Sequence, residues 1–201
     1  MRKTELSHDD LKKKAVLEAE RLAQSGGLSA ISMRPVAKAA QCSPGTLYNV
    51  IGDLDELVLL VNARTTEAIT DCLEQAADKS DDPVRRIYEM ADAYVALGMS
   101  DARLWSVLFD YVYPEERKLP DWYSEILSQP VLVIQKAVGS AFATEEQCTR
   151  FVSEIWVSLH GVLILAMKNK LVYLSEKSVQ HFVKDLISTH LTAHGVEARN
   201  E

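Results

Sequence analysis

Two short helical segments, separated by only two residues, constrain the fold of this chain more than any other feature. The first is predicted over Met33 to Ala40, with Ser32 as its N-cap. The second restarts at Ser43, which is a good N-cap, and Pro44 presets φ for its first helical residue. Because two short helices joined by so tight a turn must cross at a steep angle, we expect a helix-turn-helix.

An amphipathic helix precedes this pair. Its small and apolar residues recur at three- and four-residue steps from Leu11 to Ala23, and Gly26-Gly27 is expected to end it. Asp9 or Asp10 is the expected N-cap. We expect this helix to pack against the corner of the two short helices, which small and apolar side chains can close: Val36, Ala37, Ala40, Cys42 and Leu47.

The rest of the chain also predicts helix. Eight Gly and six Pro are few for 201 residues, and Ala, Leu, Glu and Lys dominate most windows, which favours helix over sheet. Caps and apolar spacing predict helices from about Asp55 toward Lys79, from Pro83 to about Gly98, from Asp101 to before Pro114, from Asp121 to about Gly139 with a kink or restart at Pro130, over 148–167, and over 179–191. The chain is therefore predicted to be all-α, with about nine helices.

Charge is distributed unevenly along the chain. The net charge of −7 argues against a polyanionic partner when it is taken over the whole molecule. Residues 1–52, however, carry eight basic and five acidic side chains, a net charge of +3, whereas residues 53–201 carry fourteen basic and twenty-four acidic ones. The two parts therefore differ in the sign of their net charge, and only residues 1–52 are compatible with a nucleic-acid partner.

The stretch from Ile31 to Leu57 resembles the TetR/AcrR family of transcriptional regulators. The resemblance rests on the S-P-G-T-L-Y sequence of residues 43–48, followed at the right distance by the acidic pair Asp55-Glu56 and Leu57. It covers roughly residues 10–60. It implies a helix-turn-helix DNA-binding domain over residues 1–54 and a larger helical regulatory domain, for ligand binding and dimerisation, over residues 55–201.

Three positions depart from the usual pattern of that family. Gln41 stands where a turn glycine is common, and Ile51 stands where phenylalanine is common. Leu54 replaces a lysine that commonly contacts phosphate. One backbone contact of the family is therefore not expected here.

The candidate DNA-binding residues lie on the two short helices. The N-terminus of the second helix presents unpaired N–H groups and a partial positive charge, which suit a phosphate. Arg34 could read guanine bidentately, and Asn49 could do the same for adenine; the resemblance assigns backbone contacts to Thr46 and Tyr48. The full set is Ser32, Arg34, Ser43, Pro44, Gly45, Thr46, Tyr48 and Asn49. The alternative is that Ser43 and Thr46 are only caps, Tyr48 a packing residue and Arg34 a solvated charge, while the run Lys12 to Lys14 could equally approach phosphate or be a solvated face.

The apolar pattern of the last two expected helices predicts a homodimer. The helix over 148–167 is apolar around much of its circumference, so it is expected to be buried on more than one side. Two such helices per chain can form a four-helix bundle with a two-fold mate. The candidate interface residues are Ile155, Leu159, Leu163, Phe182, Leu186 and His190.

Aromatic residues cluster in the middle of the chain. Trp105, Phe109 and Tyr113 are four residues apart and are expected to share a helical face, which could line an apolar ligand cavity or be plain core. The sequence of Trp156, His160 and Gly161 resembles a C-terminal pattern of a subset of the same family, although a lone histidine on an apolar helix is more often a core residue. The candidate pocket residues are Tyr88, Trp105, Phe109, Tyr113, Trp122, Trp156 and His160. His190 and His194 are best interpreted as solvated.

These features lead to one predicted function and two alternatives. We expect a cytoplasmic, sequence-specific DNA-binding regulator, a repressor that a small-molecule effector releases from a palindromic operator on double-stranded DNA. The alternatives are a regulator that answers to a protein or to no ligand, and a helical binding or enzymatic bundle without a DNA role. No catalytic constellation rises above chance, so we expect no enzyme.

We also expect no cofactor, metal or membrane anchor. The three cysteines form no C-x-x-C pair and are expected to be reduced. The polar residues 1–5 contain no apolar signal region, and the longest apolar run, Val157 to Met167, is eleven residues long, which is too short to span a bilayer.

Overall fold

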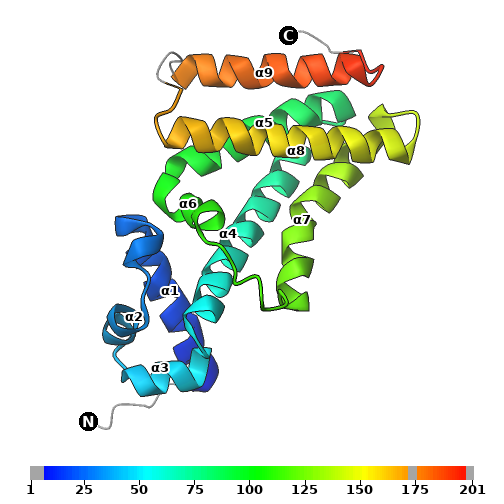
Figure 1. The fold of residues 1–201 in the computed structure, drawn as a ribbon. Coiled ribbons are helices and arrows are strands. Elements are labelled where there is room, and N and C mark those ends of the chain that lie inside the picture. The colour runs from blue at the N-terminus through cyan, green and yellow to red at the C-terminus, as the bar shows by residue number, and fades with distance from the viewer. Residues whose placement is uncertain (1–6, 172–175, 198–201) are drawn as a thin grey trace. The chain divides into compact units, whose positions relative to one another are not determined.

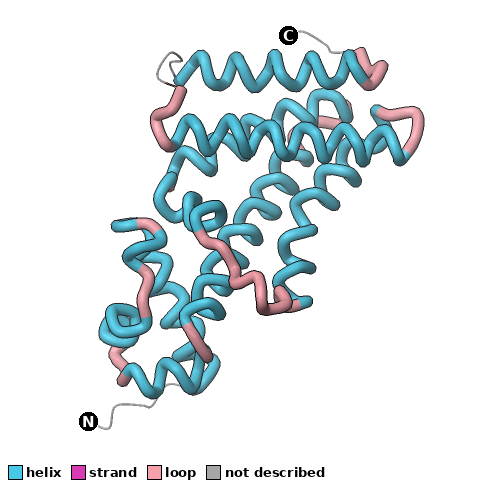
Figure 2. The backbone as a smooth tube through the Cα atoms, in the orientation of Figure 1, coloured by secondary structure: helices cyan, strands magenta, loops and turns pink. Residues whose placement is uncertain are grey.

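The computed structural model describes residues 7–171 and 176–197, in which the chain forms nine α-helices, two short 3₁₀ helices and no strand (Figures 1 and 2). The expectation of an all-α chain with about nine helices is confirmed for these residues. The N-terminal residues 1–5, where no signal region was expected, lie outside them. The chain divides into two compact units: one holds the residues up to Thr65 together with Asp101–Ser124, and the other holds Thr66–Ser100 and the residues from Glu125 onward.

The first unit is built around a helix-turn-helix. It contains α1 (His8–Gly26), η1 (Leu28–Ala30), α2 (Met33–Ala40), α3 (Pro44–Ile51), the start of α4 (Leu54–Ala77), α6 (Ala102–Asp110) and the start of α7 (Asp121–Val138). Helix α1 packs against α2, α3 and α6, and α2 packs against α3. The corner of the two short helices is closed as the sequence predicts, because Val36, Ala37 and Leu47 are completely buried in the core of this unit.

The turn between α2 and α3 is stabilised by backbone hydrogen bonds. Gln41 adopts the left-handed conformation, with φ of 63°, and the N–H of Cys42 donates to the carbonyl of Ala37 at 2.9 Å. This is the hydrogen bond of a Schellman helix end, in which glycine is the usual left-handed residue. The chain thus forms the tight turn with a glutamine in that position.

The start of α1 differs from the prediction. Ser7, rather than Asp9 or Asp10, is the N-cap, and its Oγ accepts the N–H of Asp10 at 3.1 Å. The Ser7 hydroxyl in turn donates to the carboxylate of Asp10 at 2.7 Å. The two aspartates lie in the first turn, where negative charge interacts favourably with the helix dipole.

The second unit is a helical bundle. It contains the remainder of α4, α5 (Pro83–Ser100), the remainder of α7, η2 (Gly139–Ala141), α8 (Glu145–Met167) and α9 (Glu176–Ala193). Helices α8 and α9 lie side by side, and α5 packs against both of them (Figure 1). Buried side chains on these three helices include Tyr94, Phe151, Leu163, Ile187 and Leu191.

Helix α6 differs from the prediction in one respect, and α7 excludes one of the two alternatives predicted at Pro130, the restart. Helix α6 ends at Asp110, with Tyr111 extended at φ −87° and ψ 126°, so Tyr113 does not share a helical face with Trp105 and Phe109. Pro114 follows Tyr113, and a residue before proline is disfavoured in the helical conformation. Pro130 lies inside α7, which continues through it as one helix and does not restart there.

Helix α8 is apolar well beyond the surface that it buries. Within the described residues it is the one helix long and apolar enough to cross a membrane by length and composition alone, with a mean hydropathy of 1.4. A core helix of a soluble protein also meets this criterion, and α8 packs against both α5 and α9. Only 28% of the apolar stretch is buried, so α8 presents a large uncovered surface.

Candidate nucleic-acid interface

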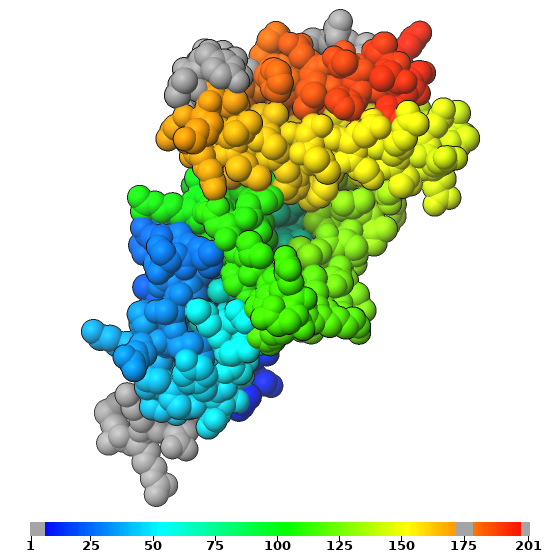
Figure 3. All heavy atoms as spheres, in the orientation of Figure 1, coloured from blue at the N-terminus to red at the C-terminus, as the bar shows by residue number. Residues whose placement is uncertain are grey.

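Most of the sequence-predicted DNA-binding residues are exposed on α2 and α3 or at the starts of these helices, which are drawn in light blue to cyan in Figure 3. Leu47, Val50 and Ile51 form the buried face of α3, which turns Tyr48 and Asn49 outward. Tyr48 is 51% exposed, an unusual value for a large aromatic residue that serves only in packing. Seven of the eight candidates are exposed: Arg34, Ser43, Pro44, Gly45, Thr46, Tyr48 and Asn49.

The N-terminus of α3 is organised by Ser43. The Oγ of Ser43 accepts the N–H of Thr46 at 3.0 Å and is hydrogen-bonded to the Thr46 hydroxyl at 2.8 Å. Ser43 is therefore a cap, as one of the two interpretations of the sequence holds. Pro44 has no N–H, so the N–H of Gly45 is the first-turn donor that the helix itself leaves without a partner.

Ser32 is placed differently. It is the N-cap residue of α2 by its extended backbone, but its side chain makes no capping hydrogen bond. It is half-buried at the start of the helix that carries the exposed Arg34. Its hydroxyl is consequently not used for capping, unlike that of Ser43.

Two basic residues extend the candidate surface beyond the predicted set. Lys38 is exposed in the last turn of α2. Lys14, on α1, lies close enough to Cys42 to oppose the effect of burial, which raises the pKa of that thiol. The charge run Lys12 to Lys14 was the sequence signal for this neighbourhood, and periodicity alone could not say which of its lysines lies near the turn.

Side chains from α4 and α6 contact α1, the helix that packs against α2 and α3. Arg64 of α4 forms an ion pair with Glu20 of α1. Arg103 of α6 donates to the carbonyl of Ser25 near the end of α1, whose last turn has no basic residue of its own. A cation at this position complements the partial negative charge of a helix C-terminus.

The predicted pocket residues belong to both units. Trp105, Phe109, Tyr113 and Trp122 lie in the first, and Tyr88, Trp156 and His160 lie in the second. The structure brings Trp156 and His160 together, with ring centroids 4.3 Å apart. Tyr94, which the predicted set omits, completes the group: its ring lies 5.3 Å from each of the other two.

His160 is held in one neutral form. Its Nδ1 lies 2.7 Å from the carbonyl oxygen of Trp156, and because a carbonyl can only accept, Nδ1 carries the proton. Burial lowers the pKa of His160, and the bond to Trp156 partly opposes this. These contacts are those of a hydrogen-bonded core histidine, which is the alternative that the sequence left open.

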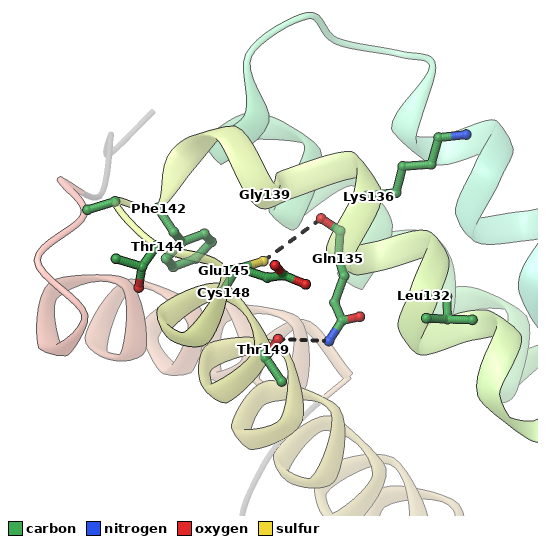
Figure 4. A pocket seen from close by; sticks show the side chains of 10 residues that line it. Leu132, Gln135, Lys136, Gly139, Phe142, Thr144, Glu145, Cys148 and Thr149 are labelled. Carbon is green, nitrogen blue, oxygen red and sulfur yellow. Dashed lines mark hydrogen bonds between the residues drawn. The ribbon is translucent and has the colours of Figure 1, made fainter.

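Two pockets that lie in the second unit are not formed mainly by the predicted residues. One, of about 470 Å³, lies between the end of α7 and the start of α8 and contains none of them; Cys148 and Gln135 line it (Figure 4). The other, of about 740 Å³, lies between α5 and α9, where Tyr88 adjoins charged side chains such as Arg85 and Lys184. Within the described part of the chain, no group of three or more His, Cys, Asp or Glu side chains is arranged to hold a metal ion.

The candidate dimer residues fall into two groups. Ile155, Leu159 and Leu163 are buried in the core of their own unit, so little of their surface is left for a partner. Phe182 is 45% exposed, and Leu186 and His190 are half-buried. The exposed apolar residues of α8 are Val157, at 71%, and Leu165, at 45%, and neither is in the predicted set.

The interpretation of His194 as solvated is wrong. Its side chain is only 4% exposed, and its Nε2 lies 2.8 Å from a carboxylate oxygen of Glu154 on α8. The rings of Phe142 and Phe151 meet it edge to face. The turn after α9 therefore packs against α8 instead of fraying, which the sequence spacing could not show.

Comparison with known proteins identifies the fold. No protein-family model matches the sequence, and no curated protein is significantly similar to it in sequence. Solved structures match almost the whole chain. A protein of unknown function from Rhodococcus sp. RHA1 matches with a TM-score of 0.75 and 18% identity, covering 96% of this chain and 98% of that one.

One further match is a named regulator, and another is a complex with a small ligand. A TetR transcriptional regulator from the same organism has a TM-score of 0.70 and 15% identity, over 92% of this chain and 98% of that one. RolR in complex with resorcinol has a TM-score of 0.68 and 17% identity, and the match covers 95% of this chain and 90% of that one. The chain therefore has the fold of the TetR-family transcriptional regulators.

Proposed function

We propose that this chain is a sequence-specific DNA-binding transcriptional regulator of the TetR type, a repressor released from a palindromic operator by a small-molecule effector. The exposed N-terminus of α3, with Tyr48 and Asn49 outward, is the observation that carries this proposal. The TetR-type fold supports it. Residues 1–54 read DNA in this proposal, and residues 55–201 supply regulation and dimerisation, although Asp101–Ser124 packs with the DNA-reading unit.

Each exposed side chain receives a role from its chemistry. The N–H of Gly45 and the hydroxyls of Thr46 and Tyr48 contact phosphate, which sets the position of α3 in the major groove. Arg34 reads guanine and Asn49 reads adenine, because their side chains can form two hydrogen bonds with those bases. Ser32, Lys38 and Lys14 supply further backbone contacts. Ser43 and Pro44 shape the helix end that presents these donors.

The active species is a homodimer. The uncovered apolar surface of α8, with Val157 and Leu165, and the exposed Phe182 of α9 supply the interface. Leu186 and His190 lie at its margin, and Ile155, Leu159 and Leu163 support it from within. A two-fold dimer places two copies of α3 in successive major grooves, roughly 34 to 36 Å apart. Such a regulator is cytoplasmic and has no catalytic role.

A small aromatic molecule is the effector class that we favour. RolR, one of the structurally similar proteins, has been solved in complex with resorcinol as its ligand. In the present chain Tyr94, Trp156 and His160 form an aromatic group that could stack against such a ring. Because the same three rings also contact one another, a second candidate is a regulator whose interior is filled by its own side chains.

A thermal-shift screen of phenolic compounds separates these two candidates. A specific ligand at 100 times its dissociation constant stabilises the folded dimer by about 2.7 kcal/mol. A Trp156→Ala variant should lose this response, and Trp122→Ala, in the other unit, should retain it. If no compound raises the melting temperature of the wild type or of either variant, the regulator without a ligand is favoured.

The decisive test of the DNA role is selection of bound duplexes from a random pool by the full-length protein. We expect a palindrome with half-sites about one helical turn apart and an affinity that falls as salt rises. Arg34→Ala and Asn49→Ala should change the selected bases, whereas Arg85→Ala, which removes an exposed arginine from α5, should not. If no sequence is enriched, or if the affinity for duplex DNA does not change with salt concentration, the results would instead support a helical bundle without a DNA role.

A further inference from the structure

The loop after α6 reaches back to the first turn of α4. The hydroxyl of Tyr111 donates to Asp55 at 2.8 Å. Arg117 donates from Nη1 to Asp53 at 3.0 Å and to Asp55 at 2.7 Å. The guanidinium also lies 5.4 Å from the centre of the Tyr113 ring, within the range of a cation–π contact. These side chains thus connect two segments that are more than fifty residues apart in sequence.

The two carboxylates lie at the corner that joins α3 to α4. Helix α3 ends at Ile51, and its C-cap Gly52 has φ of 105° and donates its N–H to the carbonyl of Tyr48 at 2.9 Å. The next residue, Asp53, caps α4 by accepting the N–H of Glu56 at 2.8 Å. A side chain that fixes Asp53 therefore acts two residues beyond the end of the helix that presents Tyr48 and Asn49.

The other end of the loop is anchored in the same unit. Val107 of α6 is fully buried in its core, and Leu104 and Tyr111 pack against that core. Burial, and then the hydrogen bond with Asp55, raises the pKa of Tyr111, so its hydroxyl remains a donor at neutral pH. The loop is thus held at α6 and again at Arg117, and it leads directly into α7, which begins at Asp121.

We propose that Arg117 is a positioning residue that sets the angle of α3 through Asp53 and Asp55, which makes the loop of residues 111–120 the route from α6 and α7 to the DNA-reading helix. The inference rests on the proposed function, because it assigns the regulation of that same surface. Arg117 is 43% exposed, and exposed ion pairs contribute little to stability. Its loss should therefore change the geometry of the corner while leaving the melting temperature almost unchanged.

The charge of Arg117 has a second effect on the same corner. Without the guanidinium, Asp53 and Asp55 would present two uncompensated carboxylates beside a helix that must approach phosphates. Lys118, the next residue, carries the same charge but pairs with Asp121 at 2.7 Å and not with α4. Lys118 is therefore a matched control that separates the overall charge of the loop from the contacts of Arg117 with Asp53 and Asp55, which we call the clamp.

The test compares full-length wild type with Arg117→Ala, Tyr111→Phe and Lys118→Ala. Amide hydrogen exchange of residues 44–57 should be faster in Arg117→Ala, and to a smaller degree in Tyr111→Phe, while exchange in α8 is unchanged. The affinity for the selected duplex should fall about fivefold in Arg117→Ala, the loss expected from one well-formed ion-pair network, and less than about twofold in Lys118→Ala. Arg117→Lys should restore part of the affinity, because it restores the positive charge on a shorter side chain.

Two results would overturn the clamp. One is exchange in residues 44–57 that is the same in Arg117→Ala as in wild type. The other is an equal loss of affinity in Arg117→Ala and Lys118→Ala, which would assign the effect to the charge of the loop. If wild type selects no duplex at all, the proposed function fails, and the exchange experiment on the free protein still decides for or against the clamp.

Discussion

The Oγ of Ser43 lies 3.0 Å from the backbone nitrogen of Thr46 and caps the helix that presents the candidate DNA-reading residues. The same hydroxyl is exposed at a helix end suited to phosphate. One residue therefore serves the stability of α3 and lies where an anion would bind, and the two roles can be separated by substitution.

Ser43→Ala should lower the free energy of unfolding by about 1 kcal/mol, because it leaves the Thr46 N–H without its partner. Ser43→Asp retains a capping oxygen, so its stability should be close to that of wild type. Its negative charge should nevertheless weaken DNA binding. Denaturant unfolding and duplex affinity, measured on both variants, check the two effects. If Ser43→Asp bound DNA as tightly as wild type, phosphate would not approach this end of α3.

Ala37 fixes how closely the helices of the first unit approach. It is completely buried, and its carbonyl accepts the N–H of Cys42 across the turn. Ala37→Leu should destabilise the protein by about 1 to 3 kcal/mol, since the added methylenes must displace packed neighbours. Ala39→Leu, at a half-exposed position of the same helix, is the control and should cost little. Thermal unfolding of the two variants measures the difference, and equal melting temperatures would contradict the close packing.

Val157 tests the proposed dimer interface. Its exposed position on α8 predicts that Val157→Glu leaves the fold intact and converts the dimer to a monomer, because a charge would be buried between the two copies. Val112→Glu makes the same change at a position that is 78% exposed in the other unit, and it should remain dimeric. Sedimentation or light scattering reports the mass. If the Val157→Glu variant is still a dimer, the interface does not include this surface of α8.

The lowered pKa of His160 predicts a pH dependence of stability. A histidine whose pKa is lower in the folded state than in the unfolded chain contributes stability above the unfolded value, about 6.5, and loses it as the pH falls toward the folded value. His160→Asn can still donate to the carbonyl of Trp156 but does not titrate. Between about pH 7.5 and 5, the wild type should therefore lose more unfolding free energy than the variant. If the free energy of unfolding of the wild type and of His160→Asn changes equally with pH, His160 is not buried in its neutral form.

Local signals predicted the helix-turn-helix well. Ser43-Pro44 at the start of α3 and the small Ala37 at the corner act through neighbouring backbone and short-range packing, and the structure has both as expected. The division of α8 into buried and exposed faces was not predictable in the same way. Ile155 and Val157 are both apolar, and only the direction from which α5 and α9 approach decides which of them is buried.

Longer-range contacts account for the other differences. His194 is buried because Glu154, forty residues earlier, and two phenylalanine rings meet it. Tyr113 does not share a helical face with Trp105, because α6 ends at Asp110. Arg117 has no sequence signal at all, since its partners Asp53 and Asp55 are more than sixty residues away.

The left-handed backbone of Gln41 carries a cost of about 1 to 2 kcal/mol that a glycine would avoid. This conformation persists because the buried contacts of α2 and α3 on either side of it over-determine the turn. Weakening that small core should release the turn before it unfolds the unit as a whole. Loss of DNA recognition on warming would then precede the loss of helix content, and the temperature gap between the two would measure how much of the recognition geometry depends on a single strained residue.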